Sequence, residues 1–318
     1  MSSPLSETSH MAGSRRPLQV GVQLPEVEYT ARWSELREMA RVAEAVGFDS
    51  LWVGDHHLYR DERGSRGPWE AWTQLAALAA VTETIALGPL VAATSFHQPT
   101  VLAKFAATID EISGGRLIVG LGAGWNETEY RAFGFPFDQR ISRFEEAFTI
   151  IRTLLRDGAI DFEGRFYSAR DCELLPRGPR PGGPPLMVGS MGPRMLRITM
   201  PHVQAWNAWY SWFGNRPDGL AEPLAAVAAA CREVGRDPAG VELTVAVKVA
   251  TDRATGLRDF DRVAAPPLRG TPAELAEGLR GYARVGVTHV QLVVDPIDAR
   301  AIEWLGAVLE ILDQTGPT

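Results

Sequence analysis

The 318-residue chain has little cysteine, no long apolar run and no excess of basic residues. Its two cysteines, Cys172 and Cys231, are too few for a disulfide framework, so we expect a reducing, cytoplasmic setting. No apolar stretch approaches the roughly 20 residues that a membrane-spanning helix needs. Residues 1–16 contain nothing that resembles a secretory signal, and we expect a disordered tail there. The net charge of -7 argues against a general nucleic-acid or anionic-membrane surface.

Short apolar segments alternate with amphipathic ones along the rest of the chain. The predicted strands are 18–24, 48–53, 85–91, 117–121, 185–188, 203–206, 241–249 and the segment from Gly286 to Val294. The predicted helices are 33–46, 69–81, 100–112, 140–157, 194–200, 220–234, 273–285 and 299–312. Buried parallel strands are almost continuously apolar, and strands that alternate with helices favour a parallel sheet. The sequence therefore predicts one α/β domain over residues 17–318, a (β/α)8 TIM barrel.

Residues 159–184 interrupt this alternation. Segment 161–167 is typical of a small hairpin, and segment 176–185 is rich in proline and glycine, which disfavours a helix. We expect an insertion between the fourth helix and the fifth strand that lies over the active-site mouth of the barrel.

An acid and two histidines, Asp55-His56-His57, follow the second predicted strand. Function in a parallel barrel concentrates where the strands end. Three interpretations stay open. The side chains can simply hydrogen-bond their own loop, or they can bind a metal together with His97. They can also form a cofactor or substrate site in which a histidine moves protons.

Two glycine-rich turns and one aromatic segment also follow strands. The turn at 120–125 lets the backbone approach a flat ligand, although a tight turn without a ligand explains it equally well. The turn at 189–194 opens a helix, where free N–H groups and the helix dipole favour an anion; ordinary capping is the alternative. Segment 206–213 holds five aromatic residues, which indicates a lid over an apolar pocket or an interface patch.

Taken together, these segments resemble the bacterial luciferase-like flavin and deazaflavin enzymes, and most nearly the coenzyme F420-dependent oxidoreductases. The resemblance runs from about Val20 to Leu312. Its most specific parts are PTVLAK at 99–104, SGGRL at 113–117 and GAGWNETEY at 122–130, with GSMGPR at 189–194 and Trp206-Asn207 as further matches.

The resemblance implies a role for particular residues. His56 falls on the catalytic histidine, and Asp55 falls on an acid that contacts the cofactor ring. A cis peptide between two non-proline residues, expected at Leu90–Val91, supports the back of that ring. The complete set of implied cofactor-binding residues is Asp55, Leu90, Val91, Ala92, Asn126, Gly189, Ser190, Met191 and Gly192, with the phosphate at the last four. The implied substrate pocket consists of Trp125, Trp206, Trp209 and Trp212, and no metal ligand is implied.

Two departures from the family pattern bear on the cofactor and the substrate. Trp125 stands where some sugar-phosphate-oxidising members have a glutamate, which puts that substrate in doubt. Ala123 stands where luciferase-type members have an arginine for the FMN phosphate. The second departure favours the deazaflavin F420 over FMN.

The resemblance implies hydride transfer between F420 and a small organic substrate that is apolar or aromatic. The alternatives are an FMN-dependent two-component monooxygenase, a metal-dependent hydrolase and a non-catalytic flavin-binding protein. A separate flavin or F420 reductase is an expected partner. A homodimer is expected by analogy, through the alanine-rich helices at 69–81 and 100–112.

Overall fold

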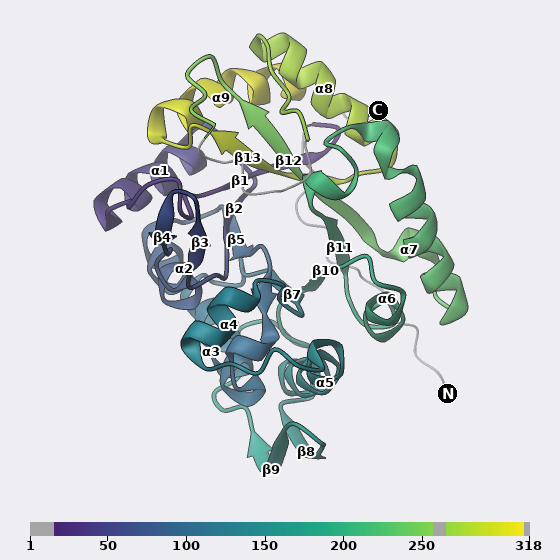
Figure 1. Ribbon diagram of the computed structural model, residues 1–318. Coiled ribbons are helices and arrows are strands. Elements are labelled where there is room, and N and C mark those ends of the chain that lie inside the picture. Colours follow the sequence, from purple (N-terminus) through teal and green to yellow (C-terminus); the bar gives the residue numbers. More distant parts are fainter. Residues whose placement is uncertain (1–15, 257–264, 315–318) are drawn as a thin grey trace.

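The computed structural model describes residues 16–256 and 265–314. The barrel strands are β1 (Gln19–Gln23), β2 (Ser50–Val53), β5 (Ala86–Pro89), β6 (Ala92–Ala93), β7 (Val119–Gly122), β10 (Leu186–Gly189), β11 (Ala205–Ala208), β12 (Glu242–Ala250) and β13 (His289–Asp295). The surrounding helices are α1 (Trp33–Ala45), α2 (Ala71–Val81), α3 (Pro99–Ile112), α5 (Arg140–Asp157), α6 (Pro193–Thr199), α7 (Ala221–Glu233), α8 (Pro272–Arg284) and α9 (Ala299–Asp313). They form a ring around the strands (Figure 1).

All neighbouring strands of the barrel sheet are parallel, in the order β5-β2-β1-β13-β12-β11-β10-β7-β6. The two ends of this order, β5 and β6, are successive parts of the third barrel strand, interrupted at Leu90 and Val91. Leu87 of β5 also bridges to Leu117, just before β7. The sheet is therefore closed, and the predicted TIM barrel is confirmed.

The start of α2 shows how local side chains set the end of an element. The sequence predicted a helix from residue 69, but α2 begins at Ala71. The carboxylate of Glu70 accepts the N–H groups of Trp72 and Thr73 at 2.9 and 2.7 Å, which caps the helix. Trp69 is left outside, and its indole donates to the carbonyl of Ala31 at 2.8 Å.

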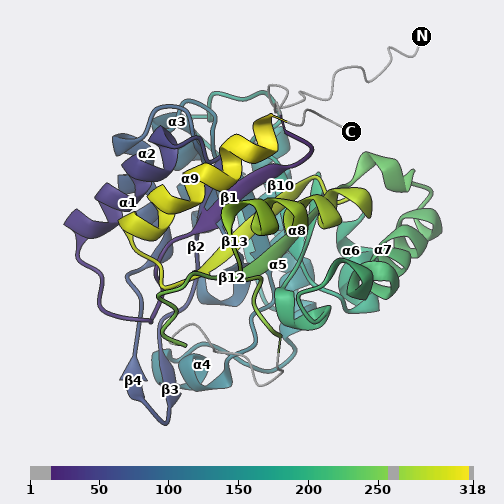
Figure 2. The same cartoon turned by 90° about the horizontal axis from the view of Figure 1, so that it is seen from above.

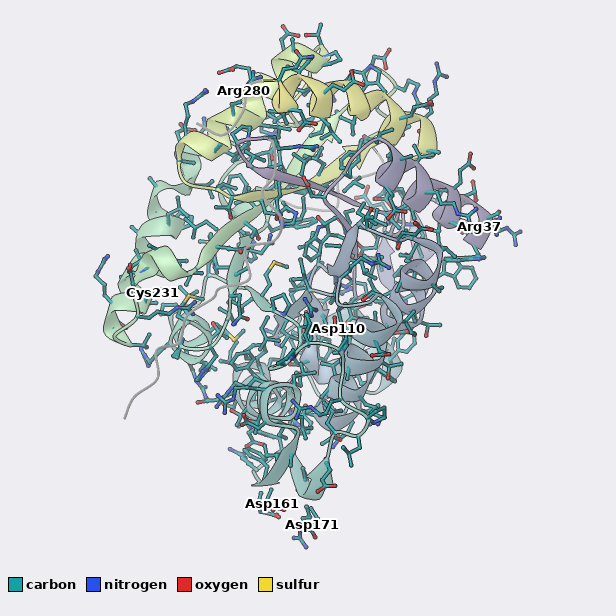
Figure 3. The ribbon with its side chains drawn as sticks, turned by 180° about the vertical axis from the view of Figure 1, so that it is seen from behind. Arg37, Asp110, Asp161, Asp171, Cys231 and Arg280 are labelled. Atoms are coloured by element: carbon teal, nitrogen blue, oxygen red, sulfur yellow. The ribbon has the colours of Figure 1, made fainter. Side chains whose placement is uncertain are left out.

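The segment at 159–184 interrupts the alternation of strands and helices, as predicted. It contains an antiparallel hairpin, β8 (Ala159–Glu163) and β9 (Ser168–Glu173), that starts where α5 ends. The hairpin packs along α5 and lies outside the ring of helices (Figure 1). Figure 3 places its labelled residues Asp161 and Asp171 at the edge of the molecule. The hairpin starts at the end of the barrel opposite the mouth, but its turn runs back along α5, where Glu146 accepts the N–H groups of Arg165, Phe166 and Tyr167. That the segment covers the active-site mouth stays a prediction.

Two small elements that the sequence did not predict lie at the mouth. They are the hairpin of β3 (Tyr59–Asp61) and β4 (Gly64–Arg66), and the helix α4 (Glu127–Phe133). Both follow barrel strands, and Figure 2 shows them together at one end of the molecule. These elements border the site described below.

Arg16, the last residue of the predicted tail, packs against the barrel domain. Residues 1–15 of the predicted tail lie outside the described residues, but Arg16 is buried. Its guanidinium donates to Asp313 at 2.8 Å and to the carbonyl of Gly47 at 3.1 Å, which joins α9 to the end of α1. Within the described ranges, no helix is long and apolar enough to cross a membrane.

Candidate active site

His56 lies three residues beyond the end of β2, at the mouth of the barrel. Its Nδ1 atom is 2.8 Å from Oε1 of Glu129, which α4 contributes. The other oxygen of Glu129 accepts the backbone N–H groups of His57 and Leu58 at 2.8 and 3.3 Å. The carboxylate is fully buried. Glu129 therefore fixes both the imidazole and the loop that carries it.

A second carboxylate, Glu26, faces the other side of the imidazole. Its Oε1 atom is 3.9 Å from Nε2 of His56 and accepts the hydroxyl of Tyr59 at 2.5 Å. Its Oε2 atom accepts the side-chain amide of Gln23 at 3.1 Å. A side chain at Gly54 would come within 2.5 Å of this carboxylate, so glycine at this position leaves room for Glu26.

The charges around His56 determine its protonation state. Burial disfavours the charged ring, but Glu26, Glu129 and Asp55 outweigh this effect and raise the pKa of His56 to about 8. Burial and the neighbouring Glu26 also raise the pKa of the Tyr59 phenol well above its usual value of 10. At neutral pH the site therefore holds an imidazolium next to a neutral phenol.

The side chain of Asp55 contacts Ala93 of β6 and His97, and makes no hydrogen bond with His56. Its Oδ2 atom accepts the N–H of Ala93 at 2.9 Å and lies 3.1 Å from Nε2 of His97. Its Oδ1 atom is buried and has no hydrogen-bond partner among the described residues. The structure thus gives no support to a direct role of Asp55 in orienting His56. The orphaned oxygen does fit a bound group that brings its own N–H or O–H donor.

The histidines at the mouth do not converge on one point. The ring of His57 packs against Phe96, Phe133 and Phe135, with centroid distances between 4.7 and 5.7 Å. Across residues 16–256 and 265–314, no three His, Cys, Asp or Glu side chains form a group that could hold a metal ion. The arrangement of Asp55, His56, His57 and His97 does not support the hydrolase alternative.

The residues between β5 and β6 have the cis peptide bond that the resemblance implied. The Leu90–Val91 peptide bond is cis, which confirms that prediction. The side chain of Val91 occupies space beside two glycines: a Cβ at Gly122 or Gly189 would lie 2.9 Å from its Cγ2 atom. The following residue, Ala92, is fully buried. Glycine at these positions of β7 and β10 therefore leaves room for the Val91 side chain.

The turn from Gly189 to Gly192 joins β10 to the start of α6, as predicted. The Ser190 hydroxyl accepts the N–H of Gly192 at 3.3 Å, and the Ser190 carbonyl accepts the indole N–H of Trp206 at 2.7 Å. Met191 is exposed. Gly192 is the N-cap residue of α6 and no side chain caps this helix start. The role of the turn in binding phosphate stays a prediction.

The four tryptophans of the expected substrate pocket have different environments. Trp125 is 60% exposed, and its ring centroid is 5.6 Å from that of His56, so it borders the site. Trp206 belongs to β11 and is fully buried in the core, so its assignment to the pocket is wrong. The Trp209 ring packs against the Tyr210 ring with a centroid distance of 4.7 Å and a tilt of 36°, and Trp212 is exposed.

The sequence did not assign a role to three residues that contact or border His56, namely Glu26, Tyr59 and Glu129. Glu26 follows β1, and Tyr59 begins β3. Glu129 lies within the family-like segment 122–130, where Asn126 was the residue singled out. Asn126 donates instead to the carbonyl of Leu58 at 2.9 Å, which ties α4 to the loop after His56. Only the position of α4 shows that Glu129 is the partner of His56.

Comparisons with known proteins agree with this geometry. Residues 17–256 match the family model described as luciferase-like monooxygenase. The chain is 33% identical over 181 residues to F420-dependent glucose-6-phosphate dehydrogenase of Amycolatopsis mediterranei, which covers 55% of this chain and 53% of that protein. It is 32% identical over 245 residues to pyrimidine monooxygenase RutA of Escherichia coli O7:K1, which covers 73% and 70% respectively. The chain spans about half the length of several such curated relatives.

Solved structures show the same fold. The coenzyme F420-dependent tetrahydromethanopterin reductase from Methanopyrus kandleri superposes with a TM-score of 0.73 at 20% identity, over 91% of this chain and 97% of that one. The closed parallel barrel, the cis peptide bond at Leu90–Val91 and the family match over residues 17–256 agree with one another. The chain belongs to the luciferase-like monooxygenase family.

Proposed function

We propose that this protein is a coenzyme F420-dependent oxidoreductase that transfers a hydride between the deazaflavin and a small organic substrate. The observation that carries the proposal is the imidazole of His56, held at the barrel mouth by Glu129 at 2.8 Å. Relatives that are named as F420-dependent enzymes add support, among them the glucose-6-phosphate dehydrogenase that is 33% identical to this chain. A positioned histidine with a pKa near neutrality is suited to accompany hydride transfer with proton transfer.

The residues at the mouth fit such a cofactor. The orphaned Oδ1 atom of Asp55 would accept a hydrogen bond from it. Leu90, Val91 and Ala92 would form the wall behind its ring, and the turn from Gly189 to Gly192 would hold its phosphate. When bound, the deazaflavin supplies the carbon that gives or takes the hydride. The protein supplies position, a proton on His56 and exclusion of water.

The substrate that we propose is apolar or aromatic. Support comes from Trp125, which is exposed beside His56 and packs 6.3 Å from the ring of Tyr59. Trp212 offers a further exposed indole. A flat apolar molecule against the Trp125 ring would keep a reacting atom near His56.

An FMN-dependent monooxygenase fed by a separate reductase is the second candidate. The similarity to pyrimidine monooxygenase RutA over 73% of this chain favours it. Titration of the purified protein with F420 and with FMN, followed by visible absorption, separates the two functions. We expect saturable binding of F420 at concentrations where FMN does not bind. Binding of FMN alone, with oxygen consumption when reduced FMN is supplied, would contradict the proposal.

We further propose that the protein is a cytoplasmic homodimer that associates through α2 and α3. The outer face of α3 exposes Val101, Phe105 and Ile112, a spacing that places them on one side of the helix. Light scattering should give twice the mass of the chain. Phe105→Glu should shift the protein toward monomer, whereas Phe133→Glu, an exposed aromatic on α4, should not.

A further inference from the structure

The imidazole of His56 lies between two buried carboxylates from distant parts of the chain. Glu129 is 2.8 Å from Nδ1 and 0% exposed, and Glu26 is 3.9 Å from Nε2 and 6% exposed. Only the imidazolium form has a proton on both nitrogens. A hydrogen-bond acceptor at Nδ1 and a carboxylate within ion-pair distance of Nε2 therefore favour this form over either neutral tautomer.

The two carboxylates differ in what else they bind. Glu129 uses its second oxygen for two backbone amides of the loop, so it also has a structural task. Glu26 points one oxygen, Oε1, at both the Tyr59 hydroxyl and Nε2 of His56. A hydroxyl that donates to a carboxylate favours the ionised form of that carboxylate. Tyr59 thus helps to keep Glu26 charged where it faces the imidazole.

The other ionisable groups around His56 act in the same direction. Asp55 lies on the same loop and adds negative charge near the ring. Glu28 accepts the backbone N–H of Glu26 at 2.6 Å and so fixes the segment that carries the second carboxylate. Acidic groups from the loop after β1, the loop after β2 and α4 therefore surround a single imidazole.

We propose that Glu26 is a positioning residue for His56, which with Tyr59 keeps a proton on Nε2 so that the histidine enters the reaction as an acid. This inference rests on the proposed function. It adds the direction of the hydride transfer, which is reduction of the substrate. When bound, the reduced deazaflavin would supply the hydride: its C–H bond would break and both electrons of that bond would pass to the substrate carbon. The Nε2–H bond of His56 breaks, and the proton joins the substrate atom that receives the displaced electron pair. His56, whose side chain is 17% exposed, then regains a proton from water.

The test is an NMR titration of the His56 ring in the protein without cofactor, with the signal assigned by its loss in His56→Asn. The wild type should titrate with a midpoint near pH 8. Glu26→Gln should weaken proton binding by about tenfold, which is one pH unit in the midpoint. Tyr59→Phe should lower the midpoint by less, because the carboxylate stays in place.

Two variants act as controls. Glu127→Gln removes the same charge from an exposed position on the helix that carries Glu129, and should leave the midpoint unchanged. Glu26→Asp retains a carboxylate and should recover part of the shift, which also covers a failure of Glu26→Gln to fold. Equal midpoints in Glu26→Gln and Glu127→Gln would overturn the positioning role. A wild-type midpoint below pH 7 would overturn the role of His56 as an acid.

Binding of F420 to the same variants separates this inference from the proposed function. Unaltered F420 affinity together with a lowered midpoint in Glu26→Gln supports both. A wild type that does not bind F420 overturns the proposed function and the direction of reaction, while the titration alone still decides whether Glu26 positions His56.

Discussion

Two histidines of this barrel, His56 and His289, are both withdrawn from water but have opposite electrostatics. His289 lies on β13 in the barrel interior, and its Nε2 atom is 2.7 Å from the Ser50 hydroxyl. Burial lowers its pKa to about 3. His56 lies at the mouth among carboxylates, and its pKa is raised to about 8. Desolvation acts on both rings in the same direction, so neighbouring charge accounts for the difference.

The comparison shows how one barrel separates structural from reactive imidazole. The interior ring shares its hydroxyl partner with the indole of Trp52, which donates to Ser50 at 2.7 Å. This small polar network carries no formal charge. The mouth instead brings acidic residues from three segments to one ring. A neutral histidine stabilises the core, whereas a charged one is available for chemistry.

The largest expected effect is on catalysis and comes from His56, the charged histidine of the pair. His56→Asn should reduce turnover by about 10²–10⁴-fold, because it removes the proton-carrying group. F420 affinity should change little, since Asp55 and the turn at 189–192 are untouched. Steady-state kinetics with the substrate found by screening, together with an absorption titration of F420, measures both. Equal losses in turnover and affinity would show that His56 serves binding.

The next largest effect is the loss of folding stability that His289 causes at acid pH. The unfolded chain binds a proton at this residue below about pH 6.5, whereas the folded ring stays neutral down to about pH 3. Stability from this residue is therefore complete above pH 6.5 and is lost as the pH falls, by about 2 kcal/mol between pH 6.5 and pH 5. Urea unfolding at both pH values should show a smaller loss in His289→Gln. The same loss in variant and wild type would contradict the neutral, buried ring.

His56 should show the opposite pH dependence of stability. Its folded pKa of about 8 exceeds the usual 6.5, so its contribution is complete below pH 6.5 and disappears as the pH rises through about 8. The difference amounts to about 2 kcal/mol. Unfolding free energies at pH 6, 7.5 and 9 should therefore converge for wild type and His56→Asn at the alkaline end. A constant difference across this range would refute the charged state of His56.

The smallest effect should come from the neutral network. Ser50→Ala leaves the indole N–H of Trp52 and Nε2 of His289 without their shared partner, which should cost about 1–2 kcal/mol. Ser168→Ala, at an exposed position of β9, is the matched control and should be neutral. Chemical denaturation of both variants measures the difference. A neutral Ser50→Ala would indicate that the network adds nothing to stability.

The sequence predicted the barrel well because its strands are apolar and its helices amphipathic, and these patterns are local. It predicted the cis bond at Leu90–Val91 through the family resemblance. It placed Trp206 in the pocket because the predicted strand ends at residue 206. In the structure β11 continues to Ala208 and the Trp206 indole is buried. It missed α4 because seven residues after a glycine turn give little periodicity. It missed Glu26 because the contact with His56 joins the loops after two neighbouring strands, β1 and β2, and no local pattern marks that contact.

The double attachment of Glu129 has a consequence for anyone who redesigns this enzyme. Replacing that carboxylate to adjust proton affinity also releases the amides of His57 and Leu58, so acidity and loop order change together. Those amides donate to Glu129, whereas the oxygen of Glu26 that faces the imidazole accepts the Tyr59 hydroxyl. Substitutions at Glu26 and Tyr59 are therefore the more selective means of shifting the pH range in which the enzyme works.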